Sequence, residues 1–237
     1  MLKNMIITID GPAGSGKSTS AKLIARRLGF TYLDTGAMYR AITYLALKNN
    51  ALNDLNEIIR LSENSKIDLS FIDGITKVTL NGEDVTSEIR SLEVNSNVSE
   101  VSAIPEVRKA LVHMQQAIGD NNNIVAEGRD TGTTVFPKAD VKIFLIASLV
   151  ERAKRRLREF QEKGEDVSFQ EIELNLSKRD KIDSQRVVSP LKKASDAIEI
   201  DTSNISIDEQ VELILDKISE IAKLKGFDIL FLKEVKS

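Results

Sequence analysis

A glycine-rich loop set between an apolar strand and a helix is the feature that most constrains this fold. Residues 11–18 read GPAGSGKS and match the pattern G-x-x-x-x-G-K-[ST]. The apolar, β-branched run at 5–9 predicts a buried strand, and apolar residues at helical spacing predict a helix over 18–28. In that setting the loop turns its backbone N–H groups, and the start of the helix, toward phosphates. The loop therefore predicts a site for a nucleoside triphosphate.

Two side chains add chemistry to the loop backbone. Lys17 brings a positive charge to the phosphates and is expected to be catalytic, and Ser18 offers a hydroxyl to magnesium. The pattern alone does not distinguish a kinase from a GTPase or a mechanical ATPase. The residues expected to bind the triphosphate are Gly11, Pro12, Ala13, Gly14, Ser15, Gly16, Lys17, Ser18 and Thr19.

Short apolar runs alternate with helical patterns along most of the chain. Runs at 30–33, 123–126, 141–147 and 197–200 predict further strands, and helices are predicted over 37–48, 92–103 and 105–118. Pro105 suits the first turn of the last of these helices. Such alternation is typical of an α/β fold, in which a parallel sheet is flanked by helices on both faces.

The middle of the chain departs from this alternation. Ile67, Leu69 and Phe71 alternate with polar residues up to the turn dipeptide at 73–74, and a second alternating run ends at the dipeptide at 81–82. Two turn dipeptides between alternating runs predict a small antiparallel meander. We therefore expect an insertion on the core, made of this meander and neighbouring helices.

Composition excludes several other kinds of site. The sequence has no cysteine, which rules out a disulfide framework, a thiolate nucleophile and a zinc site built on sulfur. The formal net charge of −3 argues against a general nucleic-acid binder. The first apolar run is too short for a signal peptide, and no stretch approaches a transmembrane length. We expect a cytoplasmic protein that binds neither nucleic acid nor membrane.

The residues after the predicted strand at 123–126 favour a small-molecule kinase. A GTPase would carry an N-K-x-D run, which this sequence lacks, and a motor ATPase usually ends four apolar residues with aspartate. Here the apolar run ends in Glu127 and continues with Gly128, Arg129 and Asp130. A carboxylate at this strand end would lie near the metal, and Arg129 would lie where a second anion binds.

Arginines from separate segments fit a clamp around two phosphates. A guanidinium presents a fixed fork of donors that matches phosphate oxygens in pairs. Arg179, Asp183 and Arg186 are spaced i, i+4, i+7, which predicts that they share one face of a single helix. We expect Arg40 and Arg129 to bind phosphate, and Arg129, Arg179 and Arg186 to act in the transfer.

A basic segment at 152–158 predicts a mobile lid. It falls on a predicted helix that ends near 163–164, and Ser168 with Glu171 resembles a capping box that opens the next helix. An arginine-rich pair of helices after a core strand suits a lid that excludes water from the phosphates. We expect Arg156 or Arg155 to contact the triphosphate, and Lys154 and Arg158 to lie on a solvated face. His113 shares a polar helix face and is assigned no catalytic role.

Three further stretches carry a resemblance to a known family. They are DTGAMYR at 34–40, EGRDTGT at 127–133, and the pattern R-D-x-x-D-x-x-R at 179–186. With the phosphate loop and the meander, their order and spacing resemble the bacterial cytidylate kinases over about 5–221. The resemblance implies transfer of the γ-phosphoryl group of ATP to CMP or dCMP with Mg²⁺, in pyrimidine nucleotide metabolism.

The resemblance also implies roles for individual residues. Ser99 and Arg108 match positions that read the cytosine ring, and Ser18 and Glu127 would hold the metal. Relatives often have aspartate where Glu127 stands, and the residues after about 221 have no clear counterpart. The residues implied to bind the acceptor are Thr35, Tyr39, Arg40, Ser99, Arg108, Gly128, Arg129, Asp130, Arg179, Asp183 and Arg186.

The expected organisation is one kinase domain over 1–237, acting as a monomer. Its core would comprise 1–60, 119–150 and 187–237, with the monophosphate-binding insertion at 61–118 and the lid at 151–186. Three alternatives stay open at this point: a kinase for another monophosphate such as AMP, UMP or dTMP, a nucleotide sensor without turnover, and a nucleic-acid ATPase. The preference between ribose and deoxyribose stays open as well.

Overall fold

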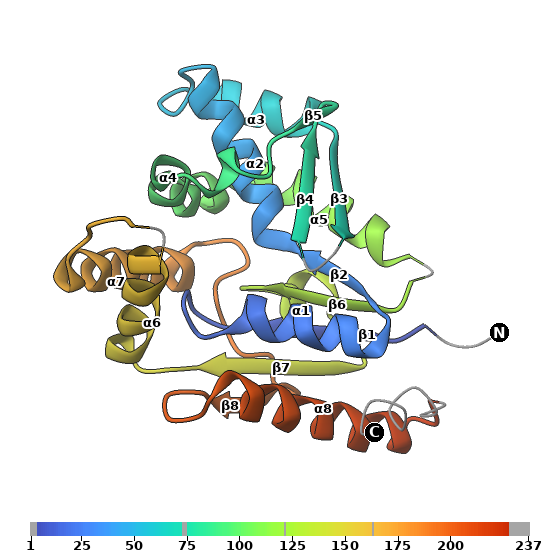
Figure 1. The fold of residues 1–237 in the computed structure, drawn as a ribbon. Helices are drawn as coiled ribbons and strands as arrows, with labels where there is room; N and C mark the ends of the chain where they lie inside the picture. Colours follow the sequence, from blue (N-terminus) through green and yellow to red (C-terminus); the bar gives the residue numbers. More distant parts are fainter. Residues whose placement is uncertain (1–3, 73–74, 121, 163, 228–237) are drawn as a thin grey trace.

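The computed structural model describes residues 4–72, 75–120, 122–162 and 164–227. Among them, five strands form a parallel sheet in the order β2-β6-β1-β7-β8 (Figure 1). All pairs in this sheet are parallel, which confirms the predicted α/β architecture. The strands are β1 (Ile6–Asp10), β2 (Thr31–Asp34), β6 (Ile124–Gly128), β7 (Val141–Ile146) and β8 (Ile198–Asp201).

The register of the central strands brings functional residues to one edge of the sheet. Asp10 at the end of β1 pairs with Gly128 at the end of β6, and Asp34 at the end of β2 pairs with Glu127. Because ligands of open α/β sheets bind outside the carboxyl ends of the strands, this edge is where a site is expected.

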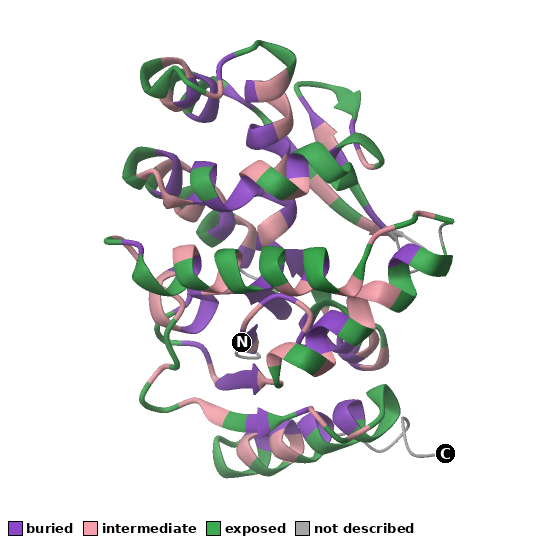
Figure 2. Ribbon diagram, turned by 90° about the vertical axis from the view of Figure 1, so that its left-hand side faces the viewer, coloured by how far each residue is buried: buried purple, intermediate pink, exposed green. Residues whose placement is uncertain are grey.

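Helices bury the two faces of the sheet in separate cores. On one face lie α1 (Lys17–Leu28) and α8 (Ile207–Leu224), whose apolar residues pack on β1 and β7. The other face is covered by α5 (Pro105–Gly119) and by a short π-helical turn at Thr131–Val135. Figure 2 shows buried residues along the strands and on the inward sides of these helices. The sheet is thus held firmly on both sides, which fixes its carboxyl edge.

The inserted elements stand above the sheet in Figure 1. They are α2 (Thr35–Lys48), α3 (Leu55–Asn64), β3 (Ile67–Ile72), β4 (Ile75–Leu80), β5 (Glu83–Asp84), a 3₁₀ turn (Glu88–Arg90) and α4 (Leu92–Ala103). Of these, α2 and the start of α3 precede the insertion expected at 61–118 but stand on the same side of the sheet as the rest. β3, β4 and β5 pair antiparallel, which confirms the predicted meander.

Of the two turns predicted in the meander, only the one at 81–82 falls on described residues. Between β4 and β5, Asn81 (φ 52°) and Gly82 (φ 89°) both have the left-handed backbone that tight hairpins require. The turn predicted at 73–74 lies outside the described residues. The helix α3 was not predicted, and it crosses the expected boundary between residues 60 and 61.

Two helices, α6 (Leu149–Glu162) and α7 (Phe169–Gln185), form the predicted lid segment at the left of Figure 1. The capping box of Ser168 and Glu171 at the start of α7 is confirmed. The prediction that Arg186 shares a helix face with Arg179 and Asp183 is wrong. The helix α7 ends at Gln185, and Arg186 is its C-cap with extended backbone (ψ 143°).

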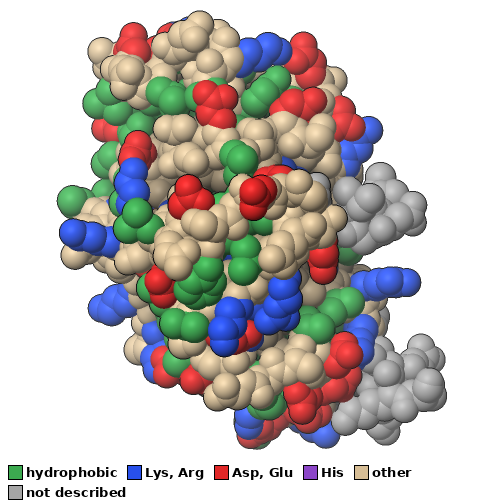
Figure 3. All heavy atoms as spheres, turned by 60° about the vertical axis from the view of Figure 1, so that its left-hand side comes forward, with side chains coloured by type: hydrophobic (Ala, Val, Ile, Leu, Met, Phe, Trp, Pro, Cys, Tyr) green, Lys and Arg blue, Asp and Glu red, His purple; other side chains and the backbone are tan. Residues whose placement is uncertain are grey.

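The surface has mixed charge on the face shown in Figure 3, where Lys and Arg side chains alternate with Asp and Glu. Within the part of the chain that the structure describes, no helix is long and apolar enough to cross a membrane.

Candidate active site

A single cavity of about 770 Å³ opens at the carboxyl edge of the sheet, between the core, the inserted elements and the lid helices. It gathers nearly all of the predicted site residues from segments far apart in the chain. Of the predicted loop residues, Gly11, Pro12 and Ser15 lie behind the lining. The predicted residues that line it are Ala13, Gly14, Gly16, Lys17, Ser18, Thr19, Thr35, Tyr39, Arg40, Ser99, Arg108, Glu127, Gly128, Arg129, Asp130, Arg156, Arg179, Asp183 and Arg186.

The phosphate loop is held in shape by its own backbone. Gly14 (φ 78°) and Gly16 (φ 87°) adopt left-handed conformations, and a side chain on Gly16 would also collide with Gln210 of α8. Ser15 Oγ donates to Pro12 O at 3.0 Å, and Lys17 Nζ donates to the same carbonyl at 2.7 Å. The loop is therefore already formed in the free protein.

Lys17 is a buried cation whose charge has a cost in the free protein. Burial and, to a smaller extent, the charge of the neighbouring Arg129 together lower the pKa of Lys17 to about 7, against the opposing effect of Glu127. An anion bound in the loop would stabilise the charged form. Lys17 is thus placed to respond to a phosphate.

Ser18 and Glu127 form the best candidate for a metal site. Ser18 Oγ donates to Glu127 Oε1 at 2.6 Å, and the Tyr32 hydroxyl donates to the same oxygen at 3.2 Å. No group of three or more His, Cys, Asp or Glu side chains in the described residues could hold a metal ion. One carboxylate and one hydroxyl suit magnesium, which usually takes one or two carboxylates and completes its shell with waters and substrate phosphates.

Carboxylates orient the arginines on the opposite wall of the cavity. Arg40 Nη2 lies 2.8 Å from Asp34 Oδ2, and Arg129 Nε lies 2.8 Å from Asp183 Oδ2. Burial opposes the charge on Arg129, but the carboxylates of Asp183 and Glu127 outweigh it and raise the pKa. Arg129 therefore stays charged, and the carboxylates hold both guanidiniums in defined directions at the cavity wall.

Asp130 joins two further arginines in a buried cluster. Its Oδ2 pairs with Arg108 Nη2, and its Oδ1 accepts from Arg186 Nη2 at 3.2 Å. Arg108 is almost fully buried, donates to Ser102 O at 3.0 Å, and lies 5.2 Å from the centre of the Tyr39 ring. Burial, with Arg108 nearby, lowers the pKa of Arg186. The predicted base reader Arg108 is thus tied to the predicted phosphate residues through one carboxylate.

Arg179 differs from the other arginines of this wall. Burial, followed by repulsion from Arg129, lowers its pKa to about 10. Within the described residues its Nε has no hydrogen-bond partner. No ion pair joins Arg179 to a carboxylate in the described part of the chain, so its guanidinium, which faces the cavity, can donate hydrogen bonds to a bound anion.

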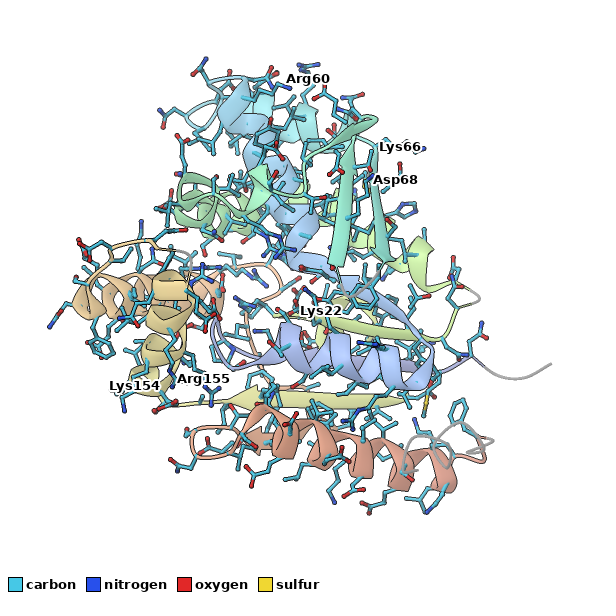
Figure 4. All side chains as sticks on the ribbon, viewed as in Figure 1. Lys22, Arg60, Lys66, Asp68, Lys154 and Arg155 are labelled. Atoms are coloured by element: carbon cyan, nitrogen blue, oxygen red, sulfur yellow. The ribbon has the colours of Figure 1, made fainter. Side chains whose placement is uncertain are left out.

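The basic side chains of α6 differ in exposure and in their contacts. Both predicted candidates, Arg155 and Arg156, line the cavity. Arg156 pairs with Glu159 at 2.6 Å, and Arg155 donates to Thr202. Lys154 is exposed as predicted, and Figure 4 shows it with Arg155 at the lower end of α6. Arg158 is exposed too, although it reaches the rim of the cavity.

Arg152 anchors the lid to the phosphate loop. It is buried and donates from Nη1 to Ala13 O at 3.0 Å and from Nε to Ala147 O at 3.0 Å, and it pairs with Asp180 of α7 at 2.7 Å. Arg152, to which the sequence assigned no role of its own, is thus the joint between α6, α7 and the loop.

Two residues of the site escaped the sequence reasoning. Asp10 is buried beneath the loop, accepts from Thr131 N at 2.9 Å and from Gly132 N at 2.7 Å, and has its pKa raised to about 6 by burial. Lys22 of α1 lines the cavity and lies on the side of the helix that faces the inserted elements (Figure 4). Its position four residues after Ser18, hence on the same helix face, was the available signal.

Comparison with known proteins agrees with this geometry. The family model described as cytidylate kinase matches residues 7–220. The cytidylate kinase of Fusobacterium nucleatum subsp. nucleatum is 49% identical over 221 residues, covering 93% of this chain and 100% of that protein. The cytidylate kinase of Carboxydothermus hydrogenoformans is 52% identical over 213 residues, covering 90% of this chain and 96% of that protein.

A solved structure supports the fold independently. An uncharacterized protein from Eubacterium ventriosum ATCC 27560 superposes with a TM-score of 0.51 at 13% identity, covering 92% of this chain and 99% of that one. At that identity the likeness concerns the fold alone. The match of the family model to most of the chain, with relatives near 50% identity, confirms the resemblance found in the sequence. This chain belongs to the cytidylate kinase family.

Proposed function

We propose that this protein transfers the γ-phosphoryl group of ATP to CMP or dCMP and releases ADP with CDP or dCDP. The observation that carries the proposal is the single cavity in which the phosphate loop faces a wall of carboxylate-oriented arginines. A donor and an acceptor phosphate can meet there in line. Membership of the cytidylate kinase family gives the acceptor.

On the donor side, the loop from Gly11 to Thr19 binds the triphosphate. Lys17 leaves the Pro12 carbonyl and binds the β- and γ-phosphates, since a phosphate oxygen is a better partner for an ammonium group than a neutral carbonyl. Arg156 comes from the lid and binds the same phosphates from above.

On the acceptor side, Arg40 and Arg129 bind the monophosphate, and Arg179 and Asp183 contact its phosphate and sugar. Ser99 and Arg108 read the cytosine ring, with Arg108 held by Asp130. Thr35, Tyr39 and Gly128 line the space between them, and Arg186 completes the pocket through Asp130. A ring read by buried hydrogen-bonding groups is discriminated strongly from its analogues.

The transfer needs no general base. A phosphate monoester has a second pKa of about 6, so its attacking oxygen is already deprotonated at neutral pH. That oxygen forms a bond to the γ-phosphorus while the bond to the β–γ bridging oxygen breaks, and ADP keeps the electron pair. Lys17, Arg129, Arg179 and Arg186 stabilise the charge that spreads over the oxygens in transfer.

Magnesium fits the residues present at the loop. Ser18 and Glu127 would hold it, directly or through water, beside the triphosphate. When bound, the metal neutralises charge on the β- and γ-phosphate oxygens.

The organisation that serves this reaction is a single domain with two mobile parts. The core comprises 1–60, 119–150 and 187–237, the insertion at 61–118 holds the acceptor, and the lid at 151–186 closes over the phosphates. Closure excludes water, which would otherwise accept the phosphoryl group. The joint made by Arg152 to Ala13 and Asp180 lets a movement of the lid reach the loop directly. We expect the protein to work as a monomer.

The test is a coupled assay of ADP release with ATP, magnesium and each of CMP, dCMP, UMP, AMP and dTMP. CMP and dCMP should turn over far faster than the others. If another monophosphate is faster, the fold and clamp stand but the assignment of Ser99 and Arg108 is wrong. If none is phosphorylated while ATP binds, the protein is a sensor.

A further inference from the structure

Several buried polar groups with no hydrogen-bond partner in the described part of the chain belong to α2 and α5, two of the elements that form the acceptor wall, meaning the side of the cavity proposed to bind the monophosphate. Gln115 of α5 is fully buried, and within the described residues neither its Oε1 nor its Nε2 has a hydrogen-bond partner. The Tyr39 hydroxyl of α2 and Nε of Arg108 likewise have no hydrogen-bond partner in the described residues. Arg108 and Gln115 are seven residues apart on the buried face of one helix, and the Arg108 guanidinium lies 5.2 Å from the Tyr39 ring centre.

Such a concentration is unusual in a folded protein. A buried donor or acceptor without a partner is destabilising, and more than about 90% of such groups are paired in native structures. Gln115 carries two of them on one side chain that apolar packing could replace. A function that uses these groups would explain why an amide stands in that position.

The unpartnered atoms are complementary to one another. Gln115 Oε1 can accept from Arg108 Nε, and Gln115 Nε2 can donate to the Tyr39 hydroxyl. Burial raises the pKa of Tyr39 to about 12, while Arg108 and, to a smaller extent, a hydrogen-bonding contact with the Gln115 side chain oppose that rise. Gln115 therefore already lies beside the Tyr39 hydroxyl, although neither group has the geometry of a full hydrogen bond. A ligand that shifts the Tyr39 ring could complete this bond.

The acceptor base is in a position to cause that movement. Tyr39 and Arg108 line the cavity, whereas Gln115 lies behind them and outside its lining. Both terminal nitrogens of Arg108 are engaged, one by Ser102 O and one by Asp130. A base that binds the N–H groups still free on these terminal nitrogens would shift Arg108 and Tyr39 together, and the unpartnered Nε of Arg108 could then bond to Gln115.

We propose that Gln115 is a positioning residue for the acceptor base: in the loaded site its amide donates to the Tyr39 hydroxyl and accepts from Arg108 Nε. The two bonds fix the ring and the guanidinium in the orientation that selects cytosine. Gln115 itself touches no substrate. The proposal rests on the proposed function, because it assumes that a cytidine monophosphate occupies this wall.

The test compares Gln115→Met with Gln116→Met. Methionine matches glutamine in length and helix propensity but removes both polar atoms. Gln116 is the matched control, since it lies on the exposed side of α5 and donates to Val135 O at 3.0 Å. Gln115→Met should lower the ratio of kcat/KM for CMP to that for UMP about tenfold, with KM for ATP unchanged. Gln116→Met should leave the ratio at the wild-type value.

Thermal stability separates positioning from a structural role. Because Gln115→Met removes unsatisfied buried groups, its Tm should be equal to or higher than that of the wild type. A double-mutant cycle with Tyr39→Phe adds a second readout. If Gln115 acts through the hydroxyl, the double variant should lose little more selectivity than Tyr39→Phe alone.

Three results would overturn the proposal. One is an unchanged CMP to UMP ratio in Gln115→Met, and another is an equal loss with every acceptor together with a lower Tm. The third is a Gln115→Asn variant that keeps full selectivity for CMP, because the shorter side chain remains polar but withdraws the amide from both partners. The Gln115→Asn variant also provides the test if Gln115→Met does not fold. A wild-type protein that does not prefer CMP to UMP would instead refute the proposed acceptor itself.

Discussion

The donor wall and the acceptor wall of the cavity differ in how far they are prepared before substrate arrives. On the donor wall, Lys17 and Ser15 already bond to the Pro12 carbonyl, and Ser18 bonds to Glu127. On the acceptor wall, the described part of the chain offers no hydrogen-bond partner to the Tyr39 hydroxyl or to Nε of Arg179. The polar side chains of the first wall are bonded to one another, whereas the second wall combines carboxylate-paired arginines with groups that have no hydrogen-bond partner among the described residues.

The difference follows from how each wall is built. The donor wall is one continuous loop, whose shape is set by left-handed glycines and by the sheet beneath it. The acceptor wall is assembled from α2, α5, β6 and α7, which come from distant parts of the chain. Side chains that come from several elements can change their contacts when a substrate binds, because each element can shift separately.

The largest effect should come from the donor wall. Lys17→Met removes the buried cation that stabilises charge on the transferring phosphoryl group, so kcat should fall by about 10³-fold. Binding of CMP alone, measured by calorimetry, should hardly change, because the acceptor wall is separate. The exposed Lys154→Met on α6 is the matched control and should keep wild-type turnover. A loss below tenfold in Lys17→Met would show that the walls are not divided in this way.

Arg108→Met should give the next largest effect and act on the acceptor wall alone. With CMP, kcat/KM should fall by about 100-fold, since a buried hydrogen-bonding group no longer reads the base. Asp130 keeps its bond to Arg186, so the stability loss should stay below the 3–5 kcal/mol, roughly, of a fully broken buried pair.

The control for Arg108→Met is the KM for ATP, which should stay at the wild-type value. Equal losses for ATP and for every acceptor would mean that Arg108 supports both walls rather than the base pocket.

Proton uptake gives a smaller and more direct test of the donor wall. With a pKa of about 7, Lys17 is mostly neutral at pH 8 in the free protein, and bound phosphates favour its charged form. Binding of MgATP at pH 8 should therefore take up close to one proton, and affinity should fall by up to about tenfold per pH unit above 7. At pH 6 the lysine is already charged, and uptake should vanish.

Calorimetry in two buffers of different ionisation enthalpy measures this uptake. Lys17→Met should abolish it, which separates Lys17 from the other titrating groups. No uptake by the wild type at pH 8 would mean that the lysine carries its charge before ATP binds.

The same division explains what the sequence could predict. The phosphate loop, the parallel strands and the meander depend on neighbouring residues, such as Asn81 and Gly82 at a hairpin turn, and these predictions were confirmed. Arg129 was predicted from its place just after a strand end, whereas Arg108 was found only through family resemblance, because its surroundings come from distant elements.

Predictions from spacing failed where tertiary contacts decide the outcome. Arg186 was placed on the face of α7 by its spacing, but the chain turns away there and Arg186 Nε donates to Ser189 O at 2.6 Å. The helix α3 was missed although Asp54 caps it, because the segment is short and only its Ile58 and Leu61 provide a buried apolar stripe. Asp10 and Gln115 could not be assigned from sequence, since their significance lies in burial and in partners across the fold.

The smallest effect tests whether the lid is independent of the core. Ser168→Ala on α7 and Ser206→Ala on α8 remove matching capping boxes, each worth about 1 kcal/mol. Losing the cap of α7 should speed amide hydrogen exchange about fivefold over 169–172, because the first turn frays. Selectivity for CMP should not change, since Arg179 lies about three turns further along α7.

Tm separates the two variants. Ser206→Ala weakens a helix that packs on the central sheet, so it should lower Tm by about 2–4 °C. Ser168→Ala should lower it less, because the lid helices bury a separate apolar cluster that includes Phe160, Ile172 and Leu176. Equal shifts of Tm would mean that the lid and the core unfold as one unit. The lid would then have to close over the donor wall by a rigid rotation about the joint at Arg152, because α7 could not loosen locally.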